Sequence, residues 1–146
     1  HSRVRRQRQM CIRDRWELAA YTEFRTNNKD GYKFKKSYPY PTGENTLGLN
    51  CLNDCNFNYP SKYSKFLLRG YGHVSTFSTK KGINGLYDMG GNVWEWVDIN
   101  DNSYKGTKGG SWWYGKNQMI QGYNATKPKN MSAVYIGFRC VKDFKN

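Results

Sequence analysis

The chain has 146 residues and a formal net charge of +13 at pH 7, with 24 Lys and Arg against 11 Asp and Glu. This length fits one domain of ordinary size, or part of a larger one. Hydrophobic residues make up 37% of the chain and aromatic residues 16%. Together these values exclude a disordered chain and predict a small core of large rings under many loops. We expect no membrane span, because no apolar run approaches the roughly 18 residues that a spanning helix needs.

The first fifteen residues differ in composition from the rest of the chain. Residues 1–15 contain six Arg and one acid, whereas Lys outnumbers Arg by fifteen to three in the remainder. The stretch MCIRDR, residues 10–15, resembles the translation of a sequencing adaptor fused to an open reading frame. We therefore expect residues 1–15 to be foreign and to lie outside the fold. The alternative is a basic arm for nucleic acid or a membrane surface.

From residue 16 onward the sequence predicts one helix and several short strands. The spacing of Trp16, Ala19, Ala20 and Phe24 predicts a helix over residues 16–25. Residues 26–65 are rich in Asn, Gly and Pro and are typical of loops. Short strands are expected at residues 73–77, 93–97, 109–113 and 134–141. This order predicts an α+β domain with little regular secondary structure.

The last predicted strand and the cysteines give further expectations about burial. In residues 134–141 one face carries Val134, Ile136, Phe138 and Cys140, and we expect this face to be buried. The core should also include Trp94, Trp96 and Trp112. Cys51 and Cys55 are either loop thiols or a disulfide, since a C-x3-C pair with no second pair or nearby His makes a poor zinc site.

The stretch GINGLYDMGGNVWEWVDIN, residues 82–100, belongs to the one acidic part of the chain. Asp88, Glu95, Asp98 and Asp101 occur there, and no Lys or Arg lies between residues 81 and 105. Hard cations such as calcium take carboxylates and backbone carbonyls from flexible loops. The glycines at residues 90 and 91 allow the chain to bend, so that nearby carbonyls converge with Asp88 and Glu95. The other interpretation is that Asp88 caps a turn and Glu95 is a solvated strand residue.

Three motifs, GLYDMGGNVWEWV, KGGSWW and IGFRCV, occur in this order. Together they resemble the formylglycine-generating sulfatase-modifying-factor family, and WELAA and YPYPTGE resemble its upstream helix and the loop after it. The resemblance covers about residues 16–143. It implies a variant of the C-type lectin fold with bound calcium, and identifies residues 16–146 as the C-terminal portion of a family domain that is truncated at its N-terminus.

The resemblance also implies which residues bind calcium. One ion would be held by the side chains of Asp88 and Glu95 and by the carbonyls of Gly91 and Val93. A second, less complete site maps onto four further positions: Asn56, Phe57, Ser75 and Phe77. Its Ser75 stands where a carboxylate can occur in the family.

Catalysis in this family is a copper-assisted oxidation of a substrate cysteine, and the resemblance places two copper thiolates five residues apart after the GGSW motif. Tyr114 and Met119 occupy these positions here. A phenol and one thioether make a poor Cu(I) pair, so we expect neither copper nor a catalytic residue. We do not expect Cys51 and Cys55 to substitute, because they belong to a different loop.

The favoured hypothesis is a non-catalytic, calcium-stabilised scaffold that binds an unknown protein or small ligand. The segment after the GGSW motif is rich in Tyr and Asn, which give adaptable contacts. We expect the ligand to contact Trp113, Tyr114, Asn117, Tyr123 and Asn124. The alternative is a divergent formylglycine-generating oxidoreductase acting on sulfatase-type cysteine motifs. Nucleic-acid binding is not expected, because the lysines are scattered and no recognition motif accompanies them.

Overall fold

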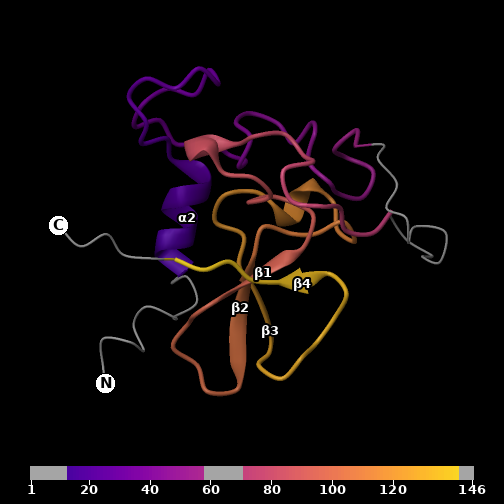
Figure 1. Cartoon of the computed structure of the whole chain (residues 1–146). Coiled ribbons are helices and arrows are strands. Elements are labelled where there is room, and N and C mark those ends of the chain that lie inside the picture. The colour runs from indigo at the N-terminus through magenta and orange to yellow at the C-terminus, as the bar shows by residue number, and fades with distance from the viewer. Residues whose placement is uncertain (1–12, 58–70, 142–146) are drawn as a thin grey trace.

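The computed structural model describes residues 13–57 and 71–141. Its helix α2 spans Arg13–Tyr21, its short 3-10 helices η2 and η3 span Ile83–Gly85 and Lys116–Gln118, and its strands are β1 (Trp94–Val97), β2 (Tyr104–Lys108), β3 (Ala125–Pro128) and β4 (Ile136–Gly137). The helix runs beside the sheet, and irregular segments fill the other end of the molecule (Figure 1). This arrangement confirms the predicted α+β class with little regular structure. Within the described ranges, no helix has the length and apolar character needed to cross a bilayer.

The described strands form one sheet in the order β3-β2-β1-β4. Strand β1 runs antiparallel to β2, which runs antiparallel to β3. Strand β4 runs parallel to β1, with Trp94 opposite Ile136 and Glu95 opposite Gly137. This parallel pairing places the IGFRCV motif beside the GLYDMGGNVWEWV motif, although about forty residues separate them in the sequence.

The helix begins and ends earlier than predicted. It begins at Arg13, inside the Arg-rich segment, and ends at Tyr21 instead of Arg25. After Tyr21 the backbone pairs with a distant segment: the Glu23 N–H donates to the Lys36 carbonyl at 3.1 Å. These long-range bonds outweigh the local helical pattern. Residues 1–12 lie outside the described residues, so the expected boundary between residues 15 and 16 stays a prediction.

Strands β2 and β3 were missed, and two predicted strands are absent from the described chain. Residues 73–77 and 109–113 form loops and turns. Gly109 and Gly110 adopt φ values of +92° and +69°, which no strand allows. A Cβ on Gly109 would lie 2.5 Å from the Met89 carbonyl oxygen, so the close approach of the two segments requires glycine.

The predicted buried face of residues 134–141 is wrong. Val134 is 66% exposed and Phe138 is 70% exposed, and Cys140 is an exposed free thiol. Only Ile136–Gly137 pair with β1, and the exposed side chains lie outside this short strand. By contrast, Trp94 and Trp112 are buried as expected, and Trp96 is partly buried.

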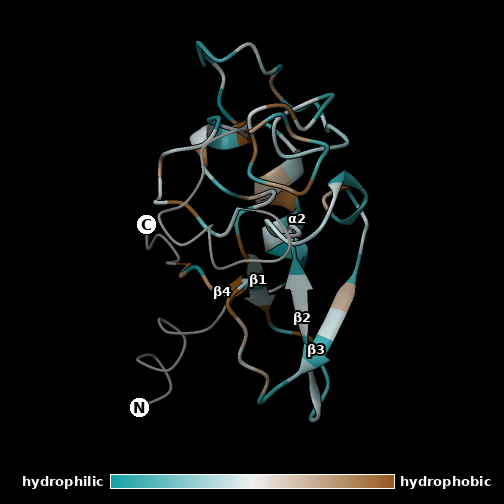
Figure 2. Ribbon diagram, turned by 90° about the vertical axis from the view of Figure 1, so that its right-hand side faces the viewer, coloured by the Kyte–Doolittle hydropathy of each residue, from teal (hydrophilic) through white to brown (hydrophobic). Residues whose placement is uncertain are grey.

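Two hydrophobic clusters form the described core. The first joins the inner face of α2 to the sheet through Trp16, Ala20, Tyr21, Met89 and Val97. The second contains Leu49, Cys55 and Met119. A hydrogen bond from the Tyr21 hydroxyl to the Met119 carbonyl, 2.7 Å long, connects the two. Figure 2 shows hydrophilic and apolar residues interspersed along the irregular segments, which accords with small separate clusters.

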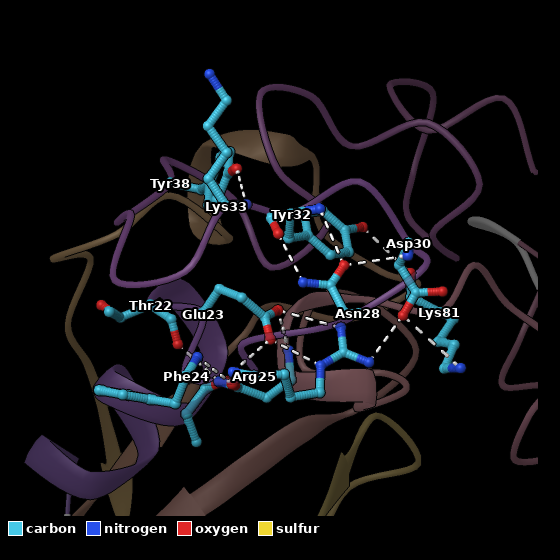
Figure 3. Close-up of polar contacts among 12 residues, drawn as sticks. Thr22, Glu23, Phe24, Arg25, Asn28, Asp30, Tyr32, Lys33, Tyr38 and Lys81 are labelled. Carbon is cyan, nitrogen blue, oxygen red and sulfur yellow. Dashed lines mark hydrogen bonds and ion pairs between the residues drawn. The ribbon is translucent and has the colours of Figure 1, made fainter.

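The loop after α2 is organised around the buried carboxylate of Glu23 (Figure 3). Glu23 accepts hydrogen bonds from Arg25 Nε at 2.7 Å and from the Asn84 N–H at 2.8 Å. Arg25 also reaches Asp30 at 2.8 Å. Burial alone would raise the pKa of Glu23, but the hydrogen bonds from Arg25 and Asn84 hold it below its ordinary value. Through its hydrogen bond with the Asn84 N–H, Glu23 therefore links the segment after α2 to η2.

Candidate cation site and aromatic surface

The acidic loop before β1 is held in a fixed bent conformation. Asp88, Gly91 and Asn92 all have positive φ values, of 59°, 71° and 62°. A Cβ on Gly91 would lie 2.4 Å from the Asn50 carbonyl oxygen. Asn92 anchors the bend, since its side-chain oxygen accepts hydrogen bonds from the Val74 N–H at 2.9 Å and from Asn50 Nδ2 at 3.2 Å. The glycine pair thus provides the predicted bend.

A cavity of about 310 Å³ lies between this loop and the end of β4. Asp88, Val93 and Glu95, three of the four predicted calcium ligands, line it. The exposed rings of Phe77 and Phe138 also line the cavity. The structure therefore brings both predicted carboxylates to one site.

Asp88 is a buried carboxylate that Thr79 hydrogen-bonds. Thr79 Oγ1 donates to Asp88 Oδ1 at 2.6 Å. Burial raises the pKa of Asp88, and the nearby charge of Glu95 adds to this, while the Thr79 hydrogen bond and the charge of Arg139 oppose it. A bound cation would favour the charged form of such a carboxylate.

Glu95 is buried and bound by Arg139, so its interpretation as a solvated strand residue is wrong. Its exposed fraction is 4%. Arg139 donates from Nε to Oε2 at 2.8 Å and from Nη2 to Oε1 at 2.7 Å. Trp16 Nε1 also donates to Oε2, at 2.7 Å. Sequence reasoning missed this pair, for which the Arg of the GFRC motif was the available signal.

The Asp88 and Glu95 carboxylates at this cavity are oxygen ligands of the kind that calcium takes together with backbone carbonyls. Among the described residues, the carbonyls of Gly91 and Val93 accept no backbone hydrogen bond. The same part of the chain holds no cluster of three His, Cys, Asp or Glu side chains. A cation here would therefore need the carbonyls, and it would share Glu95 with Arg139.

The predicted second calcium site is not assembled by any contact of the described residues. Asn56 and Phe77 have positive φ values, of 52° and 66°. The Phe77 ring packs edge-on against Tyr87 at 5.0 Å and lines the first cavity. The Ser75 carbonyl accepts the Ser78 N–H within a turn. The assignment of Asn56, Phe57, Ser75 and Phe77 stays a prediction.

Two of the predicted ligand residues, Tyr114 and Tyr123, pack against Trp94, and a third, Trp113, joins them through Tyr135. We call Trp94, Trp113, Tyr114, Tyr123 and Tyr135 the aromatic surface, in which Trp94 is the buried base and Tyr123 is the most exposed ring. Tyr114 packs edge-on against Trp94 at 5.2 Å, and Tyr123 stacks on Trp94 at 6.4 Å. Tyr135 contacts Tyr114 at 5.8 Å and Trp113 at 5.9 Å. Rings from β1 and from the segments that precede η3, β3 and β4 thus form a continuous set.

The two predicted Asn ligands occupy different settings. Asn117 lies in η3 and is exposed. Asn124 Oδ1 accepts a hydrogen bond from Lys108 Nζ at 3.4 Å. Sequence reasoning missed Lys127, whose ammonium lies 5.0 Å from the centre of the Trp94 ring. No local motif marks Lys127, since its position depends on the register of β3.

The two positions that the resemblance matches to the copper thiolates of the family, Tyr114 and Met119, contribute to packing. Met119 has an exposed fraction of 0% and belongs to the cluster with Leu49 and Cys55. Cys51 and Cys55 form a disulfide, one of the two alternatives left open by the sequence. Their loop is a different one from the loop after the GGSW motif, but the two lie against each other: the Leu52 N–H donates to the Tyr114 carbonyl at 3.0 Å.

Comparisons with known proteins agree with this architecture. The sequence matches the Sulfatase-modifying factor enzyme 1-like domain over residues 7–144. Among solved structures, the crystal structure of CarF is similar, with a TM-score of 0.63, 21% identity and coverage of 94% of this chain. The match covers 48% of the CarF chain, so this chain spans about half the length of that protein. No curated protein matches the sequence. The chain belongs to the sulfatase-modifying-factor family.

Proposed function

We propose that this chain is a non-catalytic member of its family, a calcium-stabilised scaffold that binds a protein or small ligand through the aromatic surface. The observation that carries the proposal is the packing of the positions that would hold copper thiolates. Met119 is fully buried in the core, and Tyr114 packs against Trp94. Neither side chain offers a thiolate, the ligand that Cu(I) needs in pairs.

Calcium would be held by the side chains of Asp88 and Glu95 and the carbonyls of Gly91 and Val93. The ion would supply positive charge to two buried carboxylates and fix the loop before β1. Arg139 supplies part of that charge already through its ion pair with Glu95. Calcium is therefore expected to stabilise the loop around Asp88 most.

Thermal unfolding tests the calcium part of the proposal. Addition of millimolar calcium should raise the melting temperature of the wild-type chain, and Asp88→Asn should abolish that rise. Asp98→Asn is the matched control, because Asp98 lies in the same acidic stretch but pairs with Lys105 at 2.7 Å. Equal responses of the wild type and Asp88→Asn would overturn the calcium assignment.

The aromatic surface is the best-supported contact region for a ligand, because aromatic rings supply large contact areas at low conformational cost. A defined array of peptides and small molecules tests this role. We expect bound members whose binding is lost in Tyr123→Ala but kept in Tyr71→Ala, which removes an exposed tyrosine outside the aromatic surface. Binding that survives Tyr123→Ala and Tyr114→Ala would overturn it.

One observation favours the alternative, a divergent oxidoreductase. The loop that carries Cys51 and Cys55 lies against the loop that carries Tyr114 and Met119, and the Lys116 N–H donates to Asp54 Oδ2 at 3.1 Å. Reduction of the disulfide would leave two thiols near Met119. Measurement of copper uptake distinguishes the oxidoreductase, which would bind copper, from the non-catalytic scaffold, which would not.

A further inference from the structure

Lys127 places a positive charge on the aromatic surface. Its side chain extends from β3, and Nζ lies 5.0 Å from the centre of the Trp94 ring and 5.7 Å from that of Tyr114. The negative faces of the rings attract the ammonium group. Lys127 is therefore positioned by contact with the aromatic surface.

Two lysines of the adjacent strand have acidic partners, whereas Lys127 has none among the described residues. Lys105 Nζ lies 2.7 Å from Asp98 Oδ1, and Lys108 Nζ forms an ion pair with Glu17. Within residues 13–57 and 71–141, no carboxylate forms an ion pair with Lys127. Partial burial also lowers the pKa of Lys127, because it disfavours the charged form. A negatively charged ligand group would compensate it.

The residues around Lys127 suit a ligand in which a flat apolar group lies next to the negatively charged group. Tyr123 is 37% exposed and stacks on Trp94. An aromatic ring of a ligand can therefore pack on or beside Tyr123 in an offset or edge-on arrangement. The lysine ammonium is a compact charge that donates hydrogen bonds to carboxylate or phosphate oxygens without a fixed fork geometry.

We propose that the aromatic surface binds an aryl oxyanion, a flat aromatic ring that carries a carboxylate or a phosphate, and that Lys127 contacts its anionic oxygens. The proposal rests on the ligand-binding function assigned above and adds the chemical class of the ligand. The competing possibility is that the aromatic surface binds a cation, such as a quaternary ammonium group, which would displace Lys127 from the rings.

Calorimetric titration of the whole chain with four small probes tests the proposal: phenylacetate, phenyl phosphate, benzyl alcohol and benzyltrimethylammonium. At least one of the two anions should bind about tenfold more tightly than benzyl alcohol, as expected for one charge-assisted contact. The tighter of the two identifies carboxylate or phosphate. Lys127→Met should remove this preference, and Lys127→Arg should retain most of it.

Lys129→Met is the matched control, because Lys129 is an exposed lysine just beyond the end of β3. It should leave anion binding unchanged. Thermal unfolding of each variant shows whether the fold is intact. If Lys127→Met is unfolded, the anion affinity of Lys127→Arg is compared with that of the wild type instead. Four results overturn the proposal: equal binding of anions and benzyl alcohol, tighter binding of benzyltrimethylammonium, no binding of any probe, or no loss in Lys127→Met.

Failure of this inference is distinguishable from failure of the proposed function. The array can yield ligands whose binding requires Tyr123 while the calorimetric probes show no preference for anions. In that case the aromatic surface binds ligands, and only the proposed negative charge of the ligand is wrong. If ligands from the array bind independently of Tyr123 and Tyr114, the proposed function itself fails.

Discussion

Arg139 binds both carboxylate oxygens of Glu95, with distances of 2.8 and 2.7 Å. Arg139 Nη2 also donates to the Tyr87 carbonyl at 2.7 Å. One side chain thus links the segment after β4, the strand β1 and the loop before it. The geometry explains why an Arg follows the short parallel strand: its fork matches a buried carboxylate on the neighbouring strand.

Arg139→Met should destabilise the chain by about 3 kcal/mol, because it leaves the buried Glu95 carboxylate with Trp16 as its remaining hydrogen-bond partner described here. Urea unfolding at pH 7 measures the loss. Arg13→Met is the control, since Arg13 pairs with Asp14 only at 3.9 Å on the surface, and it should change the free energy of unfolding little. A similar loss of unfolding free energy in both variants would show that the ion pair between Arg139 and Glu95 contributes no more than a surface pair.

Glu23 should make the stability of the chain sensitive to acid. Its pKa in the folded state is lowered from the ordinary value of 4.5. The carboxylate therefore stabilises the fold above about that pH, and this contribution disappears as the pH falls through the lower folded-state pKa. Glu23→Gln should be less stable at pH 7 and should lose less stability on acidification than the wild type does.

Glu44→Gln is the control for this acid dependence, because Glu44 is exposed and pairs with Lys36 at 3.2 Å. Its urea unfolding profile from pH 7 to pH 3 should follow that of the wild type. If Glu23→Gln followed it as well, the acid sensitivity would have another origin.

The disulfide between Cys51 and Cys55 should contribute modestly to stability, because it closes a short loop. Replacement of both cysteines by serine is expected to cost about 2 kcal/mol by loop-closure entropy. Urea unfolding measures this cost, and a reductant should have the same effect on the wild type. Cys140→Ser is the control, since Cys140 is an exposed free thiol. No change in the double variant would mean that the loop is held by its hydrogen bonds alone.

Local patterns predicted the elements whose own residues determine them. Apolar spacing placed Trp16 and Ala20 correctly on the inner face of α2 but also included Phe24, which is exposed, and the expected strand at residues 93–97 matches β1. Strand β2, with the sequence YKGTK, has no such pattern. It forms a strand because it pairs with β1, and a pairing between distant segments cannot be read from the local sequence.

The candidate site was predictable in its carboxylates but not in their partners. Asp88 and Glu95 stood out as acids in a basic chain, and the structure places them on one cavity. Arg139 and Lys127 were not identified, because each reaches its partner through the order of strands in the sheet. The burial of Cys140 was predicted wrongly because alternation shows which residues share a face, and not whether another layer covers that face.

Copper binding tests the central claim, that this family member is a non-catalytic scaffold, most directly. In a competition titration against a Cu(I) chelator, the wild-type chain with its disulfide intact should take up no tightly bound copper, and Met119→Leu should behave identically. A second titration of the reduced chain shows whether Cys51 and Cys55 change this result. Stoichiometric uptake that Met119→Leu or replacement of Cys51 and Cys55 abolishes would contradict the account and favour an oxidoreductase.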